Sequence, residues 1–405
     1  MNVYAYKKNK TSIREVSRII GILVSSFSAV DYGNLHYRIL EKEKNYALKK
    51  SFRNYDAYIN VTSNMISELK WWSDNIHSQN RIIDRGNADN SITTDASLEG
   101  WGAVETFDGN IKANGRWNQE EKVYHINYLE LLAILYALKA LCKDKNSLHV
   151  QILTDNTSAV AHINNMGGIK SDFLNSFSKD IWNWCCDKNI WLSAAHIPGK
   201  CNSADIESRV FNDNVEWMLD SNVFLQLAKL WGKPTMDLFA SRLNCQISKF
   251  ASWKPDPDAV VIDAFSFPWS NEYYYMFPPF SLITRCVQKI INDQSECLII
   301  LPLWPTQIWY PLAMELLIQR PVLLPRKGKL LSIPQTDKIH PLQNQMRLIP
   351  FRLSGEITKM KEFREMQPIS YLHLGEEVRR SNMQHTSVNG FCSVTKGRLI
   401  QYAQL

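Results

Sequence analysis

The stretch SITTDASLEGWGAVE at residues 91–105 decides the fold. Before it, apolar residues recur at helical spacing, whereas within it they form short β-like runs broken by glycines. A third run covers about 112–117, after the dipeptide Asp108-Gly109, which is typical of a hairpin turn. The pattern predicts three strands joined by tight turns, with Asp95 at the end of the first run.

Helices and strands alternate after these three strands. The apolar periodicity predicts a long helix at about 127–143, a buried strand at 148–154, helices at 157–164 and 172–186, a strand at 190–196 and a short helix at 203–209. This order predicts an α/β fold, in which helices pack on the faces of a mixed sheet.

Four carboxylates stand at the ends or edges of these elements: Asp95, Glu130, Asp155 and Asp205. Glu130 shares its predicted helix face with apolar residues, where an unpaired carboxylate is costly. Proteins hold Mg²⁺ with groups of carboxylate oxygens, and two such ions can act on both oxygens of a phosphodiester displacement. The four acids therefore indicate a metal site that acts on nucleic acid.

Each acid also has a structural explanation of its own. Glu130 could form a salt bridge or turn outward, and Asp155 could cap the helix that follows it. Asp205 could cap the short helix after it, and Asp95 could belong to an Asx-turn. Because all four acids could meet at one sheet, the metal site is the favoured hypothesis.

The acids lie in short sequence blocks that resemble a known family. The blocks are TDAS at 94–97 with GWGA at 100–103, NYLEL at 127–131, TDN at 154–156, and HIPGKCNSAD at 196–205 leading into ESR at 207–209. They resemble the type 1 ribonuclease H domain of retroelement reverse transcriptases, over residues 91–212. The resemblance implies an RNase H-like mixed five-stranded sheet with flanking helices.

The resemblance also implies a site and an activity. Asp95, Glu130, Asp155 and Asp205 would be the metal-binding and catalytic acids, with two Mg²⁺ ions for which Mn²⁺ could substitute. The substrate would be the RNA strand of an RNA–DNA hybrid, and Ser97 would be among the residues that reach its backbone. His196 would assist proton transfer or product release, or it would be a strand-end histidine packed against the sheet.

The flanking segments resemble parts of DIRS-type (tyrosine-recombinase) retroelement polyproteins. Residues 1–90 are expected to be a helical connection segment and 213–230 a linker helix. No Tyr/Phe-x-Asp-Asp polymerase motif appears in the sequence. The chain is therefore expected to be a fragment that lacks the polymerase palm, with a polymerase-bearing polypeptide of the same element as a partner.

Residues 231–325 are expected to form a second, smaller α/β module. Its Asp237-Leu238-Phe239 and its Phe277-Pro278-Pro279-Phe280 resemble motifs of amino-methyltransferases. Phe277 stands where those enzymes use an acceptor side chain, so the module is expected to be a degenerate, methyltransferase-like shell without activity, or merely a packed α/β module. Residues 326–405 have poor periodicity and are expected to form a basic, poorly ordered tail.

Composition narrows the class of protein. The net charge is +6, and it is unevenly distributed along the chain. Residues 1–90 contain 14 Lys and Arg against 9 Asp and Glu, and residues 326–405 contain 13 against 6, whereas the region between them is acidic. Charge alone favours ordinary solvated faces for these segments. Together with the four carboxylates, basic flanks instead suit binding of a phosphate backbone around a metal site. No membrane span or signal peptide is predicted, so an intracellular protein, cytoplasmic or nuclear, is expected.

Two other functions remain open from the sequence. A catalytically inactive scaffold could use the same fold to bind nucleic acid, with the basic ends supplying the affinity. Integrases and junction resolvases would share the fold with another substrate, but the HIPGKCNSAD block and the glutamate on the helix argue against them.

Overall fold

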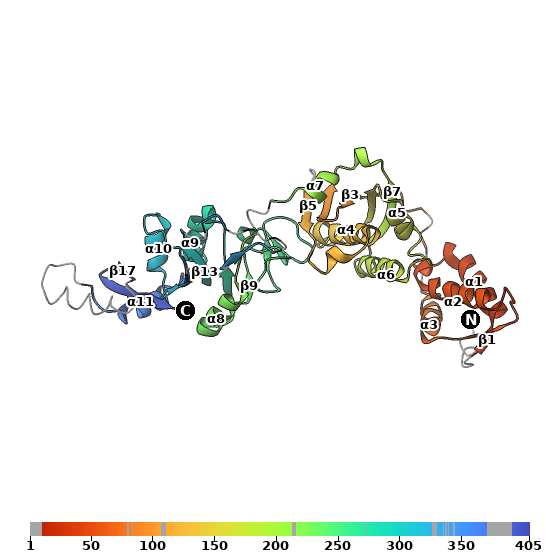
Figure 1. The fold of residues 1–405 in the computed structure, drawn as a ribbon, viewed down its shortest axis with the longest axis horizontal. Helices are drawn as coiled ribbons and strands as arrows, with labels where there is room; N and C mark the ends of the chain where they lie inside the picture. Colours follow the sequence, from red (N-terminus) through yellow and green to blue (C-terminus); the bar gives the residue numbers. More distant parts are fainter. Residues whose placement is uncertain are drawn as a thin grey trace. The chain divides into compact units, whose positions relative to one another are not determined.

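A computed structural model of the chain describes residues 10–78, 81–82, 84–106, 111–212, 216–270, 272–325, 330–334, 336, 338, 340–342, 345–370 and 391–405. The chain divides into two compact units, Met1–Val210 and Phe211–Leu405, and each is described by itself (Figure 1). The predicted turn at Asp108-Gly109 lies outside the described residues.

The first unit contains a five-stranded mixed sheet. Its strands are β3 (Asn90–Ala96), β4 (Gly100–Glu105), β5 (Ile111–Arg116), β6 (His149–Thr154) and β7 (Trp191–His196), in the order β5-β4-β3-β6-β7. The pairs β3–β4 and β4–β5 are antiparallel, and β6 runs parallel to both β3 and β7. This is the RNase H-like sheet that the sequence predicts.

Four helices accompany this sheet: α4 (Ile126–Leu141), α5 (Thr157–Asn164), α6 (Asp172–Asp187) and α7 (Asp205–Arg209). Helix α4 is apolar on nearly every side because it packs against β3 and β4 as well as against α5 and α6. It begins after His125, whose ring nitrogen accepts a hydrogen bond from the Asn127 N–H. The most buried helix of the unit therefore carries Glu130 at its first turns.

Three helices precede the sheet, in the segment that the sequence predicts to be helical: α1 (Ile13–Ser25), α2 (Arg38–Lys50) and α3 (Ser63–Asn75). A short ribbon that the sequence did not reveal joins them, with β1 (Lys10–Ser12) antiparallel to β2 (Tyr58–Asn60). Helix α3 contacts α6 through a partly buried ion pair, in which Lys179 Nζ lies 2.7 Å from a carboxylate oxygen of Glu68.

The second unit is built on a four-stranded sheet. Strands β9 (Met236–Asp237), β12 (Tyr273–Met276) and β13 (Glu296–Pro302) are parallel, and β16 (Leu348–Ser354) is antiparallel to β13 at the edge. Its helices are α8 (Ser221–Trp231), α9 (Ile283–Asn292), α10 (Trp309–Glu315) and α11 (Ile357–Glu365). Short strands complete it: β8 (Met218–Leu219), β10 (Ala251–Ser252), β11 (Val261–Ile262), β14 (Val322–Leu323), β15 (Leu331–Ser332), β17 (Cys392–Thr395), β18 (Arg398–Gln401) and β19 (Ala403–Gln404).

The expectation of a poorly ordered tail at 326–405 is wrong for its described part. Strand β16 and helix α11 belong to the core of the second unit, and Phe351 of β16 is fully buried. Pro350 lies in the middle of this strand, and a proline normally argues against a strand. It is tolerated because β16 is an edge strand. Residues 326–329 and 371–390 lie outside the described residues.

Within the described residues, the helices are all too short or too polar to cross a membrane.

Candidate metal centre

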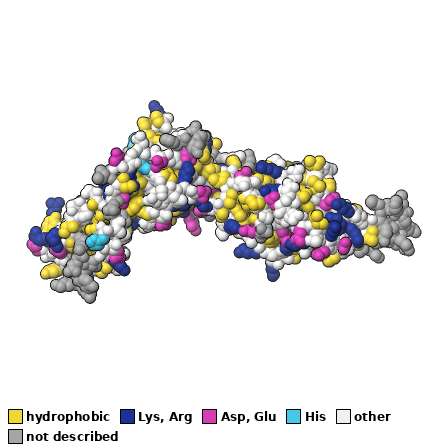
Figure 2. Space-filling model, turned by 180° about the vertical axis from the view of Figure 1, so that it is seen from behind, with side chains coloured by type: hydrophobic (Ala, Val, Ile, Leu, Met, Phe, Trp, Pro, Cys, Tyr) yellow, Lys and Arg dark blue, Asp and Glu magenta, His cyan; other side chains and the backbone are white. Residues whose placement is uncertain are grey.

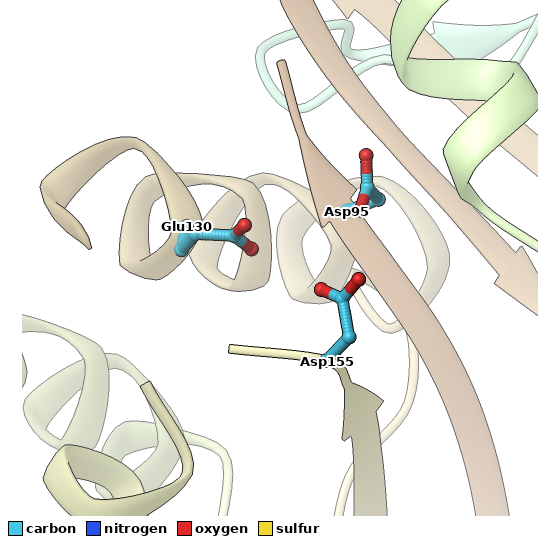
Figure 3. Close-up of side chains that lie close together, drawn as sticks. All are labelled: Asp95, Glu130 and Asp155. Carbon is cyan, nitrogen blue, oxygen red and sulfur yellow. The ribbon is translucent and has the colours of Figure 1, made fainter. Parts of the chain in front are cut away.

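Three carboxylates from three different elements meet at one edge of the five-stranded sheet. Asp95 lies in β3, Asp155 directly follows the neighbouring parallel strand β6, and Glu130 reaches them from α4. One oxygen of each carboxylate lies within 4.8 Å of the other two. Figure 3 shows Glu130 and Asp155 pointing into the space beside Asp95. Parallel neighbours end at the same edge of a sheet, which explains why residues 60 positions apart converge.

Glu130 is a buried carboxylate with one unpartnered oxygen. The residue is only 5% exposed, and its Oε2 has no hydrogen-bond partner among the described residues. Burial raises the pKa of Glu130 to about 8, and the nearby Asp95 and Asp155 add to the rise. Hydrogen bonds from Asn156 and Thr154 oppose it. A cation beside Oε2 would remove the cost of this buried carboxylate.

Asp95 is held by two side chains from the segment that carries Asp205. Asn202 Nδ2 donates to Asp95 Oδ1 at 3.0 Å, and Ser208 Oγ donates to Asp95 Oδ2 at 2.5 Å. Burial raises the pKa of Asp95, and the Ser208 hydrogen bond opposes the rise. Both donors are buried, so the orientation of Asp95 is fixed by the protein.

Asn202 and Ser208 were not identified as site residues from the sequence. Both lie within the blocks that resemble the ribonuclease H family, at 196–205 and 207–209, but neither is an acid. The signal that could have found them is their spacing, because residue 202 lies just before the short helix α7 and residue 208 lies within it, so that both can reach the same neighbouring strand.

Asp155 lies under the turn that follows β7. A Cβ added to Gly199 would lie 2.9 Å from Asp155 Oδ2, so the turn passes close to this carboxylate only because residue 199 has no side chain. Asp155 does not cap α5, since the N-cap is Asn156, whose Oδ1 accepts from the Ala159 N–H at 2.9 Å. The carboxylate of Asp155 is thus left for the centre.

Asp205 and His196 lie outside this group of three. Asp205 is the first residue of α7, and its Oδ1 accepts a hydrogen bond from Arg209 Nε at 2.8 Å. It is still near enough to contribute to the raised pKa of Asp95. His196 ends β7 opposite Thr154 and is exposed, so it is not packed against the sheet.

The Ser97 side chain is used in hydrogen bonds within the protein and does not face a substrate. The residue is buried, and its hydroxyl donates to the Ser208 backbone oxygen at 2.6 Å while it accepts from the Gly100 N–H. The expectation that Ser97 reaches a nucleic-acid backbone is therefore wrong, because its hydroxyl closes the turn between β3 and β4 and ties this turn to α7.

The donor set of the centre fits a hard divalent cation. Asp95, Glu130 and Asp155 offer only carboxylate oxygens, which are the ligands that Mg²⁺ prefers. The unpartnered Oε2 of Glu130 is the independent sign that a positive charge belongs here, since three carboxylates in so small a space repel one another.

Comparisons with known proteins give matches to solved structures alone. No family model matches the chain, and no curated protein matches it. The chain is similar to LC11-RNase H1, solved in complex with an RNA/DNA hybrid, with 22% identity, coverage of 29% of this chain and 93% of that chain, and a TM-score of 0.26. It is similar to RNase H1 from the halophilic archaeon Halobacterium salinarum, with 13% identity, coverage of 30% and 94%, and a TM-score of 0.25.

A third similar structure is the foamy viral protease-reverse transcriptase in complex with an RNA/DNA hybrid. The identity is 13%, the coverage is 51% of this chain and 28% of that chain, and the TM-score is 0.21.

Proposed function

We propose that the chain is an Mg²⁺-dependent endonuclease that hydrolyses the RNA strand of RNA–DNA hybrids, as part of a DIRS-type retroelement reverse transcriptase. The observation that carries this proposal is the convergence of Asp95, Glu130 and Asp155, one carboxylate oxygen of each lying within 4.8 Å of the others, together with a Glu130 Oε2 that lacks a partner in the described residues. The sequence blocks that hold these acids resemble those of retroelement ribonuclease H domains, which supports the same conclusion.

Asp95, Glu130 and Asp155 would hold the cation, and Asp205 would add a fourth carboxylate at the start of α7. Bound Mg²⁺ would supply Lewis-acid stabilisation of the negative charge that develops on phosphodiester oxygens during hydrolysis. Mn²⁺ also prefers oxygen ligands and would be expected to substitute.

The protein's own side chains would prepare this centre. Asn202 and Ser208 fix both oxygens of Asp95, so that this ligand does not need to be ordered when substrate binds. The raised pKa of Glu130 favours its protonated form as long as its burial is not compensated by a cation. His196, exposed at the end of β7, would accept or donate a proton next to the centre.

The substrate would be recognised by shape and charge, with little dependence on its sequence. A hybrid differs from duplex DNA by the 2′-hydroxyls and groove shape of its RNA strand. The basic flanks would supply the phosphate contacts, since the region 91–325 is acidic overall. A polymerase-bearing polypeptide of the same element would supply the hybrid, in the cytoplasm or the nucleus.

Cleavage of a labelled RNA–DNA hybrid tests the proposal. The full chain should cut the RNA strand when Mg²⁺ is present and not when it is chelated, and it should leave duplex DNA intact. Binding of the hybrid without cleavage at any Mg²⁺ or Mn²⁺ concentration would instead favour the inactive scaffold.

A further inference from the structure

A groove in the N-terminal part of the first unit lies outside the acidic centre. It has a volume of about 540 Å³ and runs between α2 and the β1–β2 ribbon. Helix α2 presents residues 43, 46, 47 and 50 to it, which share one helix face, and the ribbon adds Lys10 and Tyr58. The groove therefore has an aromatic and a basic residue on each of its two sides.

The two tyrosine side chains that line this groove, Tyr46 and Tyr58, are exposed to solvent. Tyr46 is 65% exposed and Tyr58 is 76% exposed, while Ile59 between Tyr58 and Asn60 turns into the core. Strand alternation thus fixes which side of the ribbon carries the tyrosine. Large aromatic side chains are usually buried, so two exposed ones in one groove indicate a surface that binds something.

A third aromatic residue lies at the end of α2. Phe52 is 95% exposed and has a φ of 51°, and Arg53 after it has a φ of 66°. Two consecutive residues other than glycine in the left-handed region are strained, although the Arg53 N–H donates to the Leu48 carbonyl at 2.8 Å and closes the helix end. Such strain is a reason to look for function at the site.

The basic residues around the groove are available to a ligand. Lys10, Lys49, Lys50 and Arg53 form no ion pair within the part of the chain that the structure describes, whereas Lys42 of the same helix pairs with Asp172. Glu43 is the one acid among the lining residues. Figure 2 shows dark blue Lys and Arg side chains beside yellow hydrophobic ones on the N-terminal helices.

We propose that this groove binds single-stranded nucleic acid, with Tyr46 and Tyr58 stacking on bases and Lys10 and Lys50 neutralising phosphates. Exposed aromatic rings interleaved with cations suit a strand whose bases are free, because each base offers a π-face and each nucleotide a negative charge. A duplex keeps its bases stacked inside and could use only the cations. The groove would hold unpaired template or product outside the hybrid, but its binding does not depend on the acidic centre.

Fluorescence anisotropy of a labelled 12-nucleotide oligothymidine with the full chain, in EDTA, measures this binding. The double variant Tyr46→Ala/Tyr58→Ala should bind at least about fivefold more weakly, since loss of one stacked base costs about 1 kcal/mol or more. Tyr46→Phe/Tyr58→Phe should bind like the unaltered chain because it keeps both rings. Lys10→Gln/Lys50→Gln should reduce the slope of log K against log salt by about 1.4, at about 0.7 for each phosphate contact of a single strand.

Matched controls lie in the second unit. Trp253→Ala removes a ring that is 58% exposed, and Lys361→Gln removes an exposed lysine, and neither should change the affinity. Oligothymidine carrying 5-iodouracil should crosslink to Tyr46 or Tyr58 on irradiation, as mapped by mass spectrometry. Circular dichroism shows whether each variant is folded.

Equal affinity of the unaltered chain and the alanine double variant would overturn the proposal. An equal loss of affinity for duplex DNA would overturn it as well, because it would show a general electrostatic surface. Hybrid cleavage is measured separately with Mg²⁺, so failure of the acidic centre and failure of the groove give different results.

Discussion

At the residue scale, the burial and mutual repulsion of Asp95, Glu130 and Asp155 make the folded state electrostatically less favourable. Glu130 lies in the most apolar helix of its unit, with two acids beside it and one oxygen without a partner in the described chain. A glutamate at such a position is normally replaced or neutralised. A cation that is bound in the active protein and balances the charge of the three carboxylates would explain why a glutamate is present at position 130.

The unfolding free energy should reveal this cost in the absence of metal. The pKa of Glu130 is raised from 4.5 to about 8, so the folded state keeps a proton that the unfolded state releases between these values. Stability should therefore fall as the pH rises through this window. Glu130→Gln should remove most of the fall and be more stable than the unaltered chain at pH 8.5 by a few kcal/mol, since one pKa unit is about 1.4 kcal/mol. Urea titrations in EDTA at pH 5 and 8.5 measure the unfolding free energy of both proteins. The same change in unfolding free energy between these pH values in both proteins would contradict the prediction.

Ser208→Ala should weaken the centre without removing a ligand. The substitution deletes the hydrogen bond to Asp95 Oδ2 and leaves the Ser208 backbone oxygen bound by Ser97. Loss of such a supporting contact typically costs about 10- to 100-fold in metal affinity or activity. Mg²⁺ titration of hybrid cleavage should show a higher Mg²⁺ requirement, and Ser203→Ala, an exposed serine of the same segment, is the control. The same Mg²⁺ curve for both variants would show that Asp95 needs no support.

At the element scale, the short helix α7 near the end of the first unit contacts the metal centre through Ser208 and Asp95. It packs on β4 at Gly102, where an added Cβ would lie 2.5 Å from the Ser208 nitrogen and 2.6 Å from the Ala204 oxygen. Both contacts are with backbone, so the helix itself would have to move. Because α7 carries Asp205 and Ser208, its position sets both the fourth acid and the support of Asp95.

Gly102→Ala should therefore damage the site and the fold together. Overpacking of this kind costs about 1–3 kcal/mol in unfolding free energy, and hybrid cleavage should fall with it. Gly21→Ala is the control, since Gly21 lies in the exposed part of α1 with nothing within 4 Å of an added Cβ. That control should leave stability unchanged or raise it by about 0.5–1 kcal/mol. Equal thermal midpoints for the two variants would show that α7 does not pack as described.

The elements around the acids could be predicted from the sequence because local signals decide them. The helix expected at 127–143 is Ile126–Leu141, and the helices expected at 157–164 and 172–186 are Thr157–Asn164 and Asp172–Asp187. Periodicity and caps determine such boundaries. The β1–β2 ribbon and β16 could not be predicted in this way, because three-residue strands have too little pattern and Pro350 hid the strand around it.

The site could be predicted only in part for a different reason. The acids are visible in the sequence because a carboxylate on an apolar face is anomalous. Asn202 and Ser208 are ordinary polar residues until the chain folds back and brings them to Asp95. Likewise, the sequence did not reveal that Asp205 accepts a hydrogen bond from Arg209 of the same helix and lies outside the group of three.

At the scale of the whole molecule, the chain consists of two compact units with different contents. The acidic centre and the groove between α2 and the ribbon belong to the first unit. The second unit has a cavity of about 340 Å³, lined by Phe239, Ser241 and Pro279 among others, which follow strands β9 and β12. The motifs that resemble amino-methyltransferases therefore border a cavity, as a cofactor site would.

We nevertheless expect the second unit to transfer no methyl group. Phe277 has no oxygen to accept a hydrogen bond from a target amino group, and Ala240 and Ser241 stand where a glycine-rich cofactor loop would be needed. Incubation of the full chain with radiolabelled S-adenosylmethionine and DNA should give no label in the nucleic acid. Saturable binding of S-adenosylmethionine in equilibrium dialysis, lost in Ser241→Trp, would contradict a degenerate module.

The most direct test of the acidic centre is single-turnover cleavage of an RNA–DNA hybrid by Asp155→Asn and by the unaltered chain at saturating Mg²⁺. Asparagine keeps the shape of Asp155 and removes the charge that would hold the cation. The account predicts that the variant cuts at less than about one-thousandth of the unaltered rate, a loss of about 4 kcal/mol of transition-state stabilisation, while it binds the hybrid with similar affinity. Cleavage at the unaltered rate would contradict it and would make the convergence of Asp95, Glu130 and Asp155 a structural feature alone.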